Sequence, residues 1–153
     1  MSYEQRIRDL GVELPTKIGP RGGVVPCVAV DNTLYVSGHG PEDNDGNLLF
    51  RGRVGAEVTL EEGYQAARAT GLQLLRSVRD HLGSLDRVDR IVKLLGLVNS
   101  ADDFHDQPAV IHGCSDLLVE VFGERGRHAR SAMGTSNLPL NQPVEIEMIL
   151  TFR

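Results

Sequence analysis

Two charged residues near the end of the chain, Arg130 and Glu145, are of the types that bind a small acid and activate water. They lie on either side of a midpoint near Leu138, in two β-rich segments that we expect to pair as a hairpin. A symmetric register makes them cross-strand partners with β-carbons roughly 5 Å apart. Arginine grips a carboxylate through paired N–H donors, and glutamate accepts a proton from water. An ordinary salt bridge explains the same spacing. Glu147 lies on the same face as Glu145, so repulsion can raise the proton affinity of one of the two carboxylates, although solvent at an exposed edge would screen this effect.

Three further residues are candidates for lining a ligand site: Gly38, His39 and His112. The first two belong to the segment Ser37-Gly38-His39-Gly40-Pro41, which ends a predicted strand and lets backbone amides approach a ligand closely. A plain turn fits the same residues. His112 lies at the edge of the apolar stripe of a predicted helix, where a hydrogen-bonded structural histidine is commoner than a catalytic one.

Charge and motif content argue against several classes of protein. The chain of 153 residues has 16 Lys+Arg against 21 Asp+Glu, a net charge of −5, whereas binding to a nucleic-acid backbone depends on clustered cations. Its one basic segment, 123–130, has no interleaved aromatic side chains for stacking on bases. Cys27 and Cys114 lack the spacing of metal ligands and are expected to be reduced core residues. Without a phosphate-binding glycine loop or serine-nucleophile motif, we expect chemistry or binding with no metal and no cofactor.

The length indicates one domain with a sizeable core. No run approaches the roughly 18 apolar residues of a membrane span, and the start of the chain lacks an export signal, so we expect a cytoplasmic protein without membrane contact. Glycine and proline between residues 11 and 23 interrupt regular structure after a short helix over 3–10. We therefore divide the chain into an N-terminal arm, residues 1–18, and a single domain, residues 19–153.

The elements that must position these residues are predicted from periodicity and end signals. A capping box at Thr59-Leu60-Glu61-Glu62 starts a long helix that Gly83 ends. A second helix starts at Asp106, with Pro108 in its first turn, and ends at Gly123. Strands are predicted at 24–30 and 33–37, which pair around the turn Asp31-Asn32, and a short strand is predicted at 47–51. A central strand at 88–98 is expected to be covered on both faces. The strands 129–136 and 144–152 are expected to form a closing hairpin.

Two long helices can cover only one face of such a sheet. Ile149 and Thr151 alternate onto the other face, and they are not typical of a freely solvated surface. We therefore expect a second subunit to cover that face.

Several motifs resemble the Rid family, the reactive intermediate deaminases, also called the YjgF family. They are Asn32-Thr33-Leu34-Tyr35-Val36-Ser37-Gly38, Ala129-Arg130-Ser131 and Val144-Glu145-Ile146-Glu147, and the order of elements matches from about Gly19 to Phe152. The segments 98–100, 115–123 and 126–131 are similar to a longer branch described as L-PSP endoribonuclease-like. The resemblance implies a chorismate-mutase-like α+β fold, with two long helices on one face of a mixed sheet, assembled as a homotrimer with ligand clefts between subunits.

The resemblance also implies a site. In the deaminating members, the arginine at the position of Arg130 binds the carboxylate of a 2-imino acid, and the glutamate at the position of Glu145 activates the attacking water, releasing ammonia and a 2-keto acid. This chain departs from the pattern in the wall of the pocket. The family tyrosine is absent, with Val24 at the aligned place, Ala132 replaces a cysteine, and His112 and His39 stand where Asn and Gln are usual.

Three functions remain open from the sequence. The first is hydrolysis of a 2-imino acid or enamine, with Arg130 as anchor, Glu145 as base, and Gly38, His39 and His112 lining the cleft. The second is a regulatory or carboxylate-binding trimer without turnover, suggested by the missing tyrosine. The third is an endoribonuclease using His39, His112 and His128 as acid-base groups, against which the negative net charge weighs.

Overall fold

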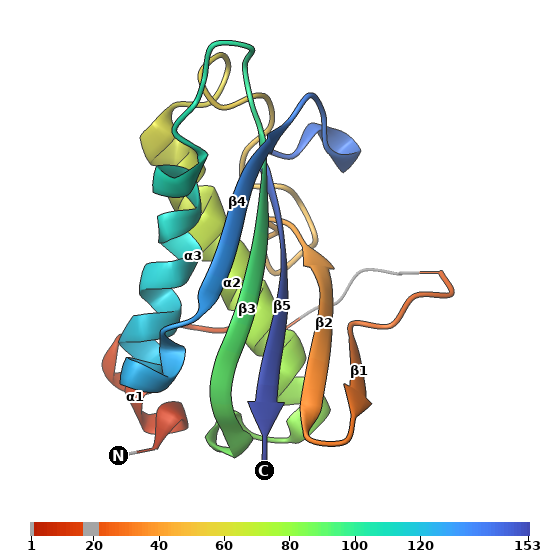
Figure 1. Cartoon of the computed structure of the whole chain (residues 1–153), viewed down its shortest axis with the longest axis vertical. Helices are drawn as coiled ribbons and strands as arrows, with labels where there is room; N and C mark the ends of the chain where they lie inside the picture. The colour runs from red at the N-terminus through yellow and green to blue at the C-terminus, as the bar shows by residue number, and fades with distance from the viewer. Residues whose placement is uncertain (1, 17–21) are drawn as a thin grey trace.

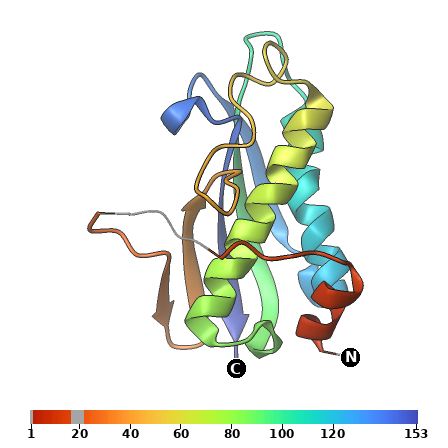
Figure 2. The same ribbon diagram turned by 180° about the vertical axis from the view of Figure 1, so that it is seen from behind.

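A computed structural model describes residues 2–16 and 22–153 of the chain. One five-stranded mixed sheet forms the first layer, and the helices α2 (Leu60–Leu82) and α3 (Gln107–Phe122) form the second. Both long helices lie on the same face of the sheet, as Figure 1 and the reverse view in Figure 2 show. This confirms the α+β class and the placement of two helices on one face. The boundary expected at residues 18 and 19 lies outside the described residues.

The sheet has the strand order β1-β2-β5-β3-β4, in which β3 and β4 are parallel and all other neighbours are antiparallel. The first two strands form the predicted hairpin, with Val30 opposite Thr33. The strands are β1 (Cys27–Val30), β2 (Thr33–His39), β3 (Val88–Asn99), β4 (Ala129–Thr135) and β5 (Val144–Phe152).

The closing hairpin predicted from the sequence is wrong. β4 and β5 are consecutive in the chain but lie on opposite edges of β3, which separates them throughout. The reason is the helix α3 between β3 and β4: it carries the chain back along the sheet, so β4 pairs parallel to β3 in a crossover unit. β5 then takes the free edge of β3 and joins it to β2.

Two smaller expectations are also corrected. Residues 47–51 form no strand, and this region contributes only an isolated bridge between Glu42 and Leu48. The strand at 88–98 is an inner strand, as expected, but β5 holds the central place, and one face of β3 is open in the single chain, where Val92 is 39% exposed.

Local end signals determine where α2 begins and ends. The Thr59 hydroxyl accepts a hydrogen bond from the Glu62 amide at 3.1 Å, and the Glu62 carboxylate accepts one from the Thr59 amide at 2.8 Å. Gly83 ends the helix at φ +82°, a conformation that favours glycine. The start of α3 is different, because Asp106 makes no side-chain cap and Pro108 alone marks the first turn.

The core lies between the two helices and the sheet. It is filled by side chains with no exposed surface, among them Leu34, Leu74, Leu75, Ile91, Leu94, Ile111, Leu117, Leu118, Ile146 and Leu150. The opposite face of the sheet carries apolar side chains in contact with solvent in the single chain, including Val28 at 50%, Tyr35 at 47% and Met133 at 49% exposure. The part of the chain that the structure describes contains no helix long and apolar enough to cross a membrane.

Candidate functional site

Arg130 lies on edge strand β4 and points to the side of the sheet covered by α3. Its Nη1 donates hydrogen bonds to Nδ1 of His112 at 3.1 Å and to Oγ of Ser115 at 3.2 Å. Among the described residues these are its only hydrogen bonds, so Nε and Nη2 keep their donors for a ligand. A pocket of about 390 Å³ lies beside the guanidinium. The protein thus fixes the guanidinium of Arg130 through Nη1. The edge formed by Nε and Nη2 can bind a carboxylate through two donors.

Two imidazoles complete this part of the site. Because a guanidinium only donates, Nδ1 of His112 must accept, so that ring is neutral in this arrangement. Oγ of Ser115 lies 3.1 Å from Nε2 of His128, whose Nδ1 lies 2.6 Å from the Gly126 carbonyl oxygen. Burial lowers the pKa of His128, and the positive charge of Arg130 lowers it further, against a hydrogen bond to Gly126 that raises it. His128 therefore favours its neutral form.

Glu145 lies on β5 and points to the open face of the sheet. It shares a small hollow there with Gly38, Leu95, Leu97 and Glu147. A β-carbon on Gly38 would lie 3.1 Å from Cδ of Glu145, so glycine allows this close approach of strand β2 to the carboxylate. The structure thus brings two predicted site residues, Gly38 and Glu145, together.

Gln142 supports this half of the site from the loop before β5. Its amide Nε2 lies 3.5 Å from Oε1 of Glu145, and its side chain packs so closely on Gly40 that a β-carbon there would lie 2.0 Å from Oε1 of Gln142. The loop is therefore fixed against the end of β2, next to the carboxylate.

Within one chain, Arg130 and Glu145 are not cross-strand partners. Arg130 lies opposite Leu94 and Glu145 lies opposite Leu97 on the intervening strand β3. Residues three apart on a strand face opposite sides of the sheet. The arginine therefore faces the helices and the glutamate faces the open side, which excludes both the predicted pairing and the simple salt bridge.

His39 does not line either part of the site. Its side chain is 2% exposed and points into the protein beneath α2. Nε2 lies 2.7 Å from the hydroxyl of Ser77, and Nδ1 lies 2.6 Å from the carbonyl oxygen of Ser37. A register shift between Val36 and His39 places Gly38 beside Glu145 while His39 points to the core. His39 therefore anchors the end of β2 to the helix.

Sequence reasoning missed two residues of this arrangement, Ser115 and Gln142. Ser115 follows His112 by three positions on a predicted helix, a spacing that places both on one helix face, so the signal was present. Gln142 lies in an irregular loop, where residue spacing does not predict orientation.

Neither cysteine is arranged as a nucleophile. Both are buried and neither forms a disulfide, as predicted. Burial raises the pKa of the Cys114 thiol to about 12, and the charge of Arg130 only partly opposes this effect.

No group of three or more potential ligand side chains that could hold a metal ion occurs within residues 2–16 and 22–153.

A mixed sheet with two long helices on one face, in this strand order, defines the chorismate-mutase-like class of α+β proteins. A family model described as "YjgF/chorismate_mutase-like, putative endoribonuclease" matches residues 4–150. The chain belongs to this family, the YjgF or Rid family. The expected resemblance is thereby confirmed.

One protein similar in sequence and three solved structures support the same assignment. Protein TCP17 of Trypanosoma cruzi is 41% identical over 145 residues, covering 94% of this chain and 90% of TCP17. A structure from Shewanella oneidensis, described as a "putative endoribonuclease", is 33% identical with a TM-score of 0.94 and covers 99% of this chain and 100% of that chain. A protein of unknown function from Agrobacterium tumefaciens is 38% identical with a TM-score of 0.89, covering 98% and 91%. RidA from a Psychrobacter species is 25% identical with a TM-score of 0.60, covering 91% and 94%.

Proposed function

We propose that this protein hydrolyses a small 2-imino acid, or the enamine in equilibrium with it, to a 2-keto acid and ammonia. The observation that carries the proposal is the guanidinium of Arg130, which is fixed through Nη1 and presents Nε and Nη2 beside a pocket of about 390 Å³. Membership in a family that includes RidA supports the choice of reaction. No cofactor is needed for so reactive a bond once its carboxylate is held and a water is positioned.

The site is completed between two copies of the chain. Arg130 and Glu145 lie on opposite faces of the sheet, so the two can act on one ligand only when they come from different subunits. The open face that carries Glu145 also exposes apolar side chains such as Tyr35 and Met133, which a second copy would bury. A homotrimer with three equivalent clefts satisfies both requirements, and a cytoplasmic location remains the expectation from the sequence.

The reaction balances with these two groups. The α-carboxylate binds Arg130, and Glu145 accepts a proton from water while the oxygen forms a bond to the imine carbon. The imine nitrogen takes up a proton, giving a tetrahedral carbon that bears both OH and NH₂. The hydroxyl proton is lost as the C–N bond breaks, the nitrogen takes up a further proton, and ammonia and the 2-keto acid leave. Glu145 returns to its ionised form.

A carboxylate-binding trimer without turnover is the second candidate. The observation that favours it is the position aligned with the family tyrosine, where Val24 is 61% exposed in the single chain and offers no hydroxyl. An endoribonuclease is less well supported, because His39 is buried and bound to Ser77.

Ammonia release tests the proposal directly. A 2-imino acid generated in place by an amino-acid oxidase should lose ammonia faster with the protein than without it. The Arg130→Ala variant should lower kcat/KM by about 10- to 100-fold, since hydrogen bonds between charged groups contribute about 1.5–3 kcal/mol. Arg8→Ala, which removes an exposed arginine from helix α1 (Tyr3–Asp9), is the matched control and should behave like the wild type.

The alternative outcomes separate the candidates. If wild type and Arg130→Ala both match the uncatalysed rate while 2-keto acids still bind the wild type, the protein is the binding trimer. If 2-keto acids do not bind either, the proposed site is wrong.

A further inference from the structure

The pocket beside Arg130 contains a second arginine that the proposed reaction does not use. Arg127 lines the same 390 Å³ space, and no acidic side chain does so in the part of the chain that the structure describes. The full lining is His112, Ser115, Val119, Arg127, His128 and Arg130. A pocket that gathers two guanidinium groups in a protein of net charge −5 attracts anions locally against the overall charge.

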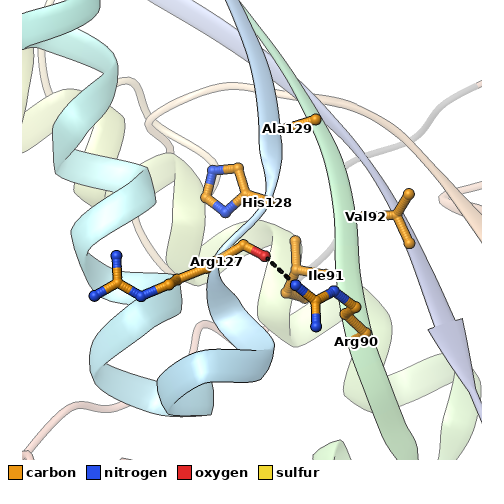
Figure 3. A pocket seen from close by; sticks show the side chains of 6 residues that line it. All are labelled: Arg90, Ile91, Val92, Arg127, His128 and Ala129. Atoms are coloured by element: carbon orange, nitrogen blue, oxygen red, sulfur yellow. Dashed lines mark hydrogen bonds between the residues drawn. The ribbon is translucent and has the colours of Figure 1, made fainter.

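A second hollow of about 360 Å³ extends this positive region. Figure 3 shows it, lined by Arg90, Arg127 and His128 together with three apolar residues, Ile91, Val92 and Ala129. Arg127 and His128 border both hollows, and Nη2 of Arg90 donates to the carbonyl oxygen of Arg127 at 3.4 Å. The two hollows therefore adjoin at Arg127.

Arg127 retains donors for a ligand. Its Nε donates to the Glu124 carboxylate at 2.9 Å, and both side chains of that pair are well exposed, at 66% and 85%. Such an exposed ion pair holds its partners weakly. Among the described residues, Nη1 and Nη2 of Arg127 have no other hydrogen-bond partner. The guanidinium is thus available to a second anionic group, and Val119 adds an apolar side chain to the lining of the same pocket.

We propose that the substrate is dianionic: a 2-imino acid with a second carboxylate on its side chain. The α-carboxylate binds Arg130 and the distal carboxylate binds Arg127. This inference rests on the proposed function, because it assigns Arg130 to the α-carboxylate. It adds a specificity residue and a substrate class, the imines of acidic amino acids.

Calorimetric binding of two 2-keto acids tests this assignment. 2-Oxoglutarate carries a distal carboxylate, whereas 2-oxopentanoate has the same chain length without it. The wild type should bind 2-oxoglutarate roughly tenfold or more tightly than 2-oxopentanoate, since the second carboxylate gains charge-assisted hydrogen bonds. Arg127→Gln should bring the ratio of the two Kd values close to one.

Arg125→Gln is the matched control. Arg125 lies two residues away, pairs with Asp89, and lines neither hollow, so its loss should leave the ratio of Kd values as in the wild type. Kinetics with oxidase-generated imines of glutamate and norvaline should show the same preference in kcat/KM.

Failure of this inference and failure of the proposed function give different results. Equal binding of both 2-keto acids, unaffected by Arg127→Gln, would overturn the second carboxylate site and leave the proposed reaction intact. Absence of binding by either 2-keto acid, together with absence of ammonia release from either imine, would overturn the proposed function itself. A ratio altered as much by Arg125→Gln as by Arg127→Gln would show general charge attraction in place of a built site.

Discussion

Arg130 is held by neutral groups and not by an acidic partner. Ser115 accepts a hydrogen bond from Arg130 and lies 3.1 Å from Nε2 of His128, which the Gly126 carbonyl orients from its other side. A guanidinium fixed in this way keeps its charge for a ligand, because no neighbouring carboxylate neutralises it. The arrangement suits a binding group better than a structural ion pair.

The protonation of His128 makes stability depend on pH. Burial lowers its pKa in the folded protein below 6.5, its ordinary value, so the unfolded chain takes up a proton first as the pH falls. We expect the contribution of His128 to be fully present above pH 6.5 and to be lost as the pH falls through the folded pKa. Urea unfolding at a series of pH values should show a smaller loss of stability on acidification for His128→Gln than for the wild type.

His105 provides the control for this measurement. It is exposed and makes no hydrogen bond in the described structure, so His105→Gln should keep the pH dependence of the wild type. If the free energy of unfolding depended on pH in the same way in the wild type and in His128→Gln, His128 would not be the source of this pH dependence.

The thiol of Cys114 should be inert in the folded protein. Its side chain has no exposed surface, and burial raises its pKa to about 12, so very little thiolate forms at about pH 8. Peptide mapping after treatment with iodoacetamide should find Cys114 unmodified under native conditions and fully modified in urea. Rapid modification of Cys114 under native conditions would contradict this prediction and show that α3 opens easily to solvent.

At the scale of elements, the crossover from β3 through α3 to β4 determines which face Arg130 occupies. The helix returns the chain along the sheet and sets β4 parallel to β3, with Arg130 on the same side as α3. β5 then pairs with the other edge of β3, and its register turns Glu145 to the open face. The two functional side chains are separated by one strand although only a short loop divides their strands in sequence.

The packing of α2 on α3 depends on Gly113. A β-carbon at this position would lie 2.0 Å from the carbonyl oxygen of Tyr64 on α2, a contact that backbone atoms cannot relieve without moving the helices. We expect Gly113→Ala to lower the free energy of unfolding by about 1–3 kcal/mol or more, as overpacked cores do. Urea denaturation measures this change.

Gly23→Ala is the matched control for the same substitution. Among residues 2–16 and 22–153, no heavy atom outside the immediate chain neighbours lies within 4 Å of a β-carbon built at Gly23. The free energy of unfolding of Gly23→Ala should therefore stay close to that of the wild type. An equal loss in both variants would mean that the effect of Gly113→Ala does not come from the contact with α2.

At the scale of the whole molecule, the proposed function requires more than one copy of the chain, because Arg130 and Glu145 lie on opposite faces of the sheet within one chain. The 16.7 kDa chain should elute as a species of about 50 kDa in light-scattering chromatography if three copies assemble. The open face would then lose its solvent contact, and the two halves of the site would meet in each cleft.

Mixing two inactive variants tests whether the site is shared between copies. Arg130→Ala and Glu145→Gln should each be nearly inactive alone, because every cleft lacks one group. After coexpression, random assembly should restore both groups in about a quarter of the clefts, so activity should return to about that fraction of the wild type. If both groups acted from one chain, no cleft of the mixed trimer would regain activity.

The sequence by itself determined the features that depend on neighbours along the chain. The capping box at Thr59, the left-handed Gly83 and the turn at Asp31-Asn32 act within a few residues, so their signals can be read locally. The motifs around Arg130 and Glu145 likewise predicted the family.

Only the tertiary structure decided how those two residues face. The order of strands in the sheet depends on which strand edges, distant in sequence, pair with each other. The alternation of side chains along a strand does not reveal this order, because it is the same whichever strand lies alongside. The short loop between β4 and β5 favoured a hairpin, but the crossover through α3 and the free edge of β3 placed a strand between them. The same long-range pairing turned His39 into the core and left Gly38 beside Glu145, because the register shift in β2 has no counterpart in the residue pattern.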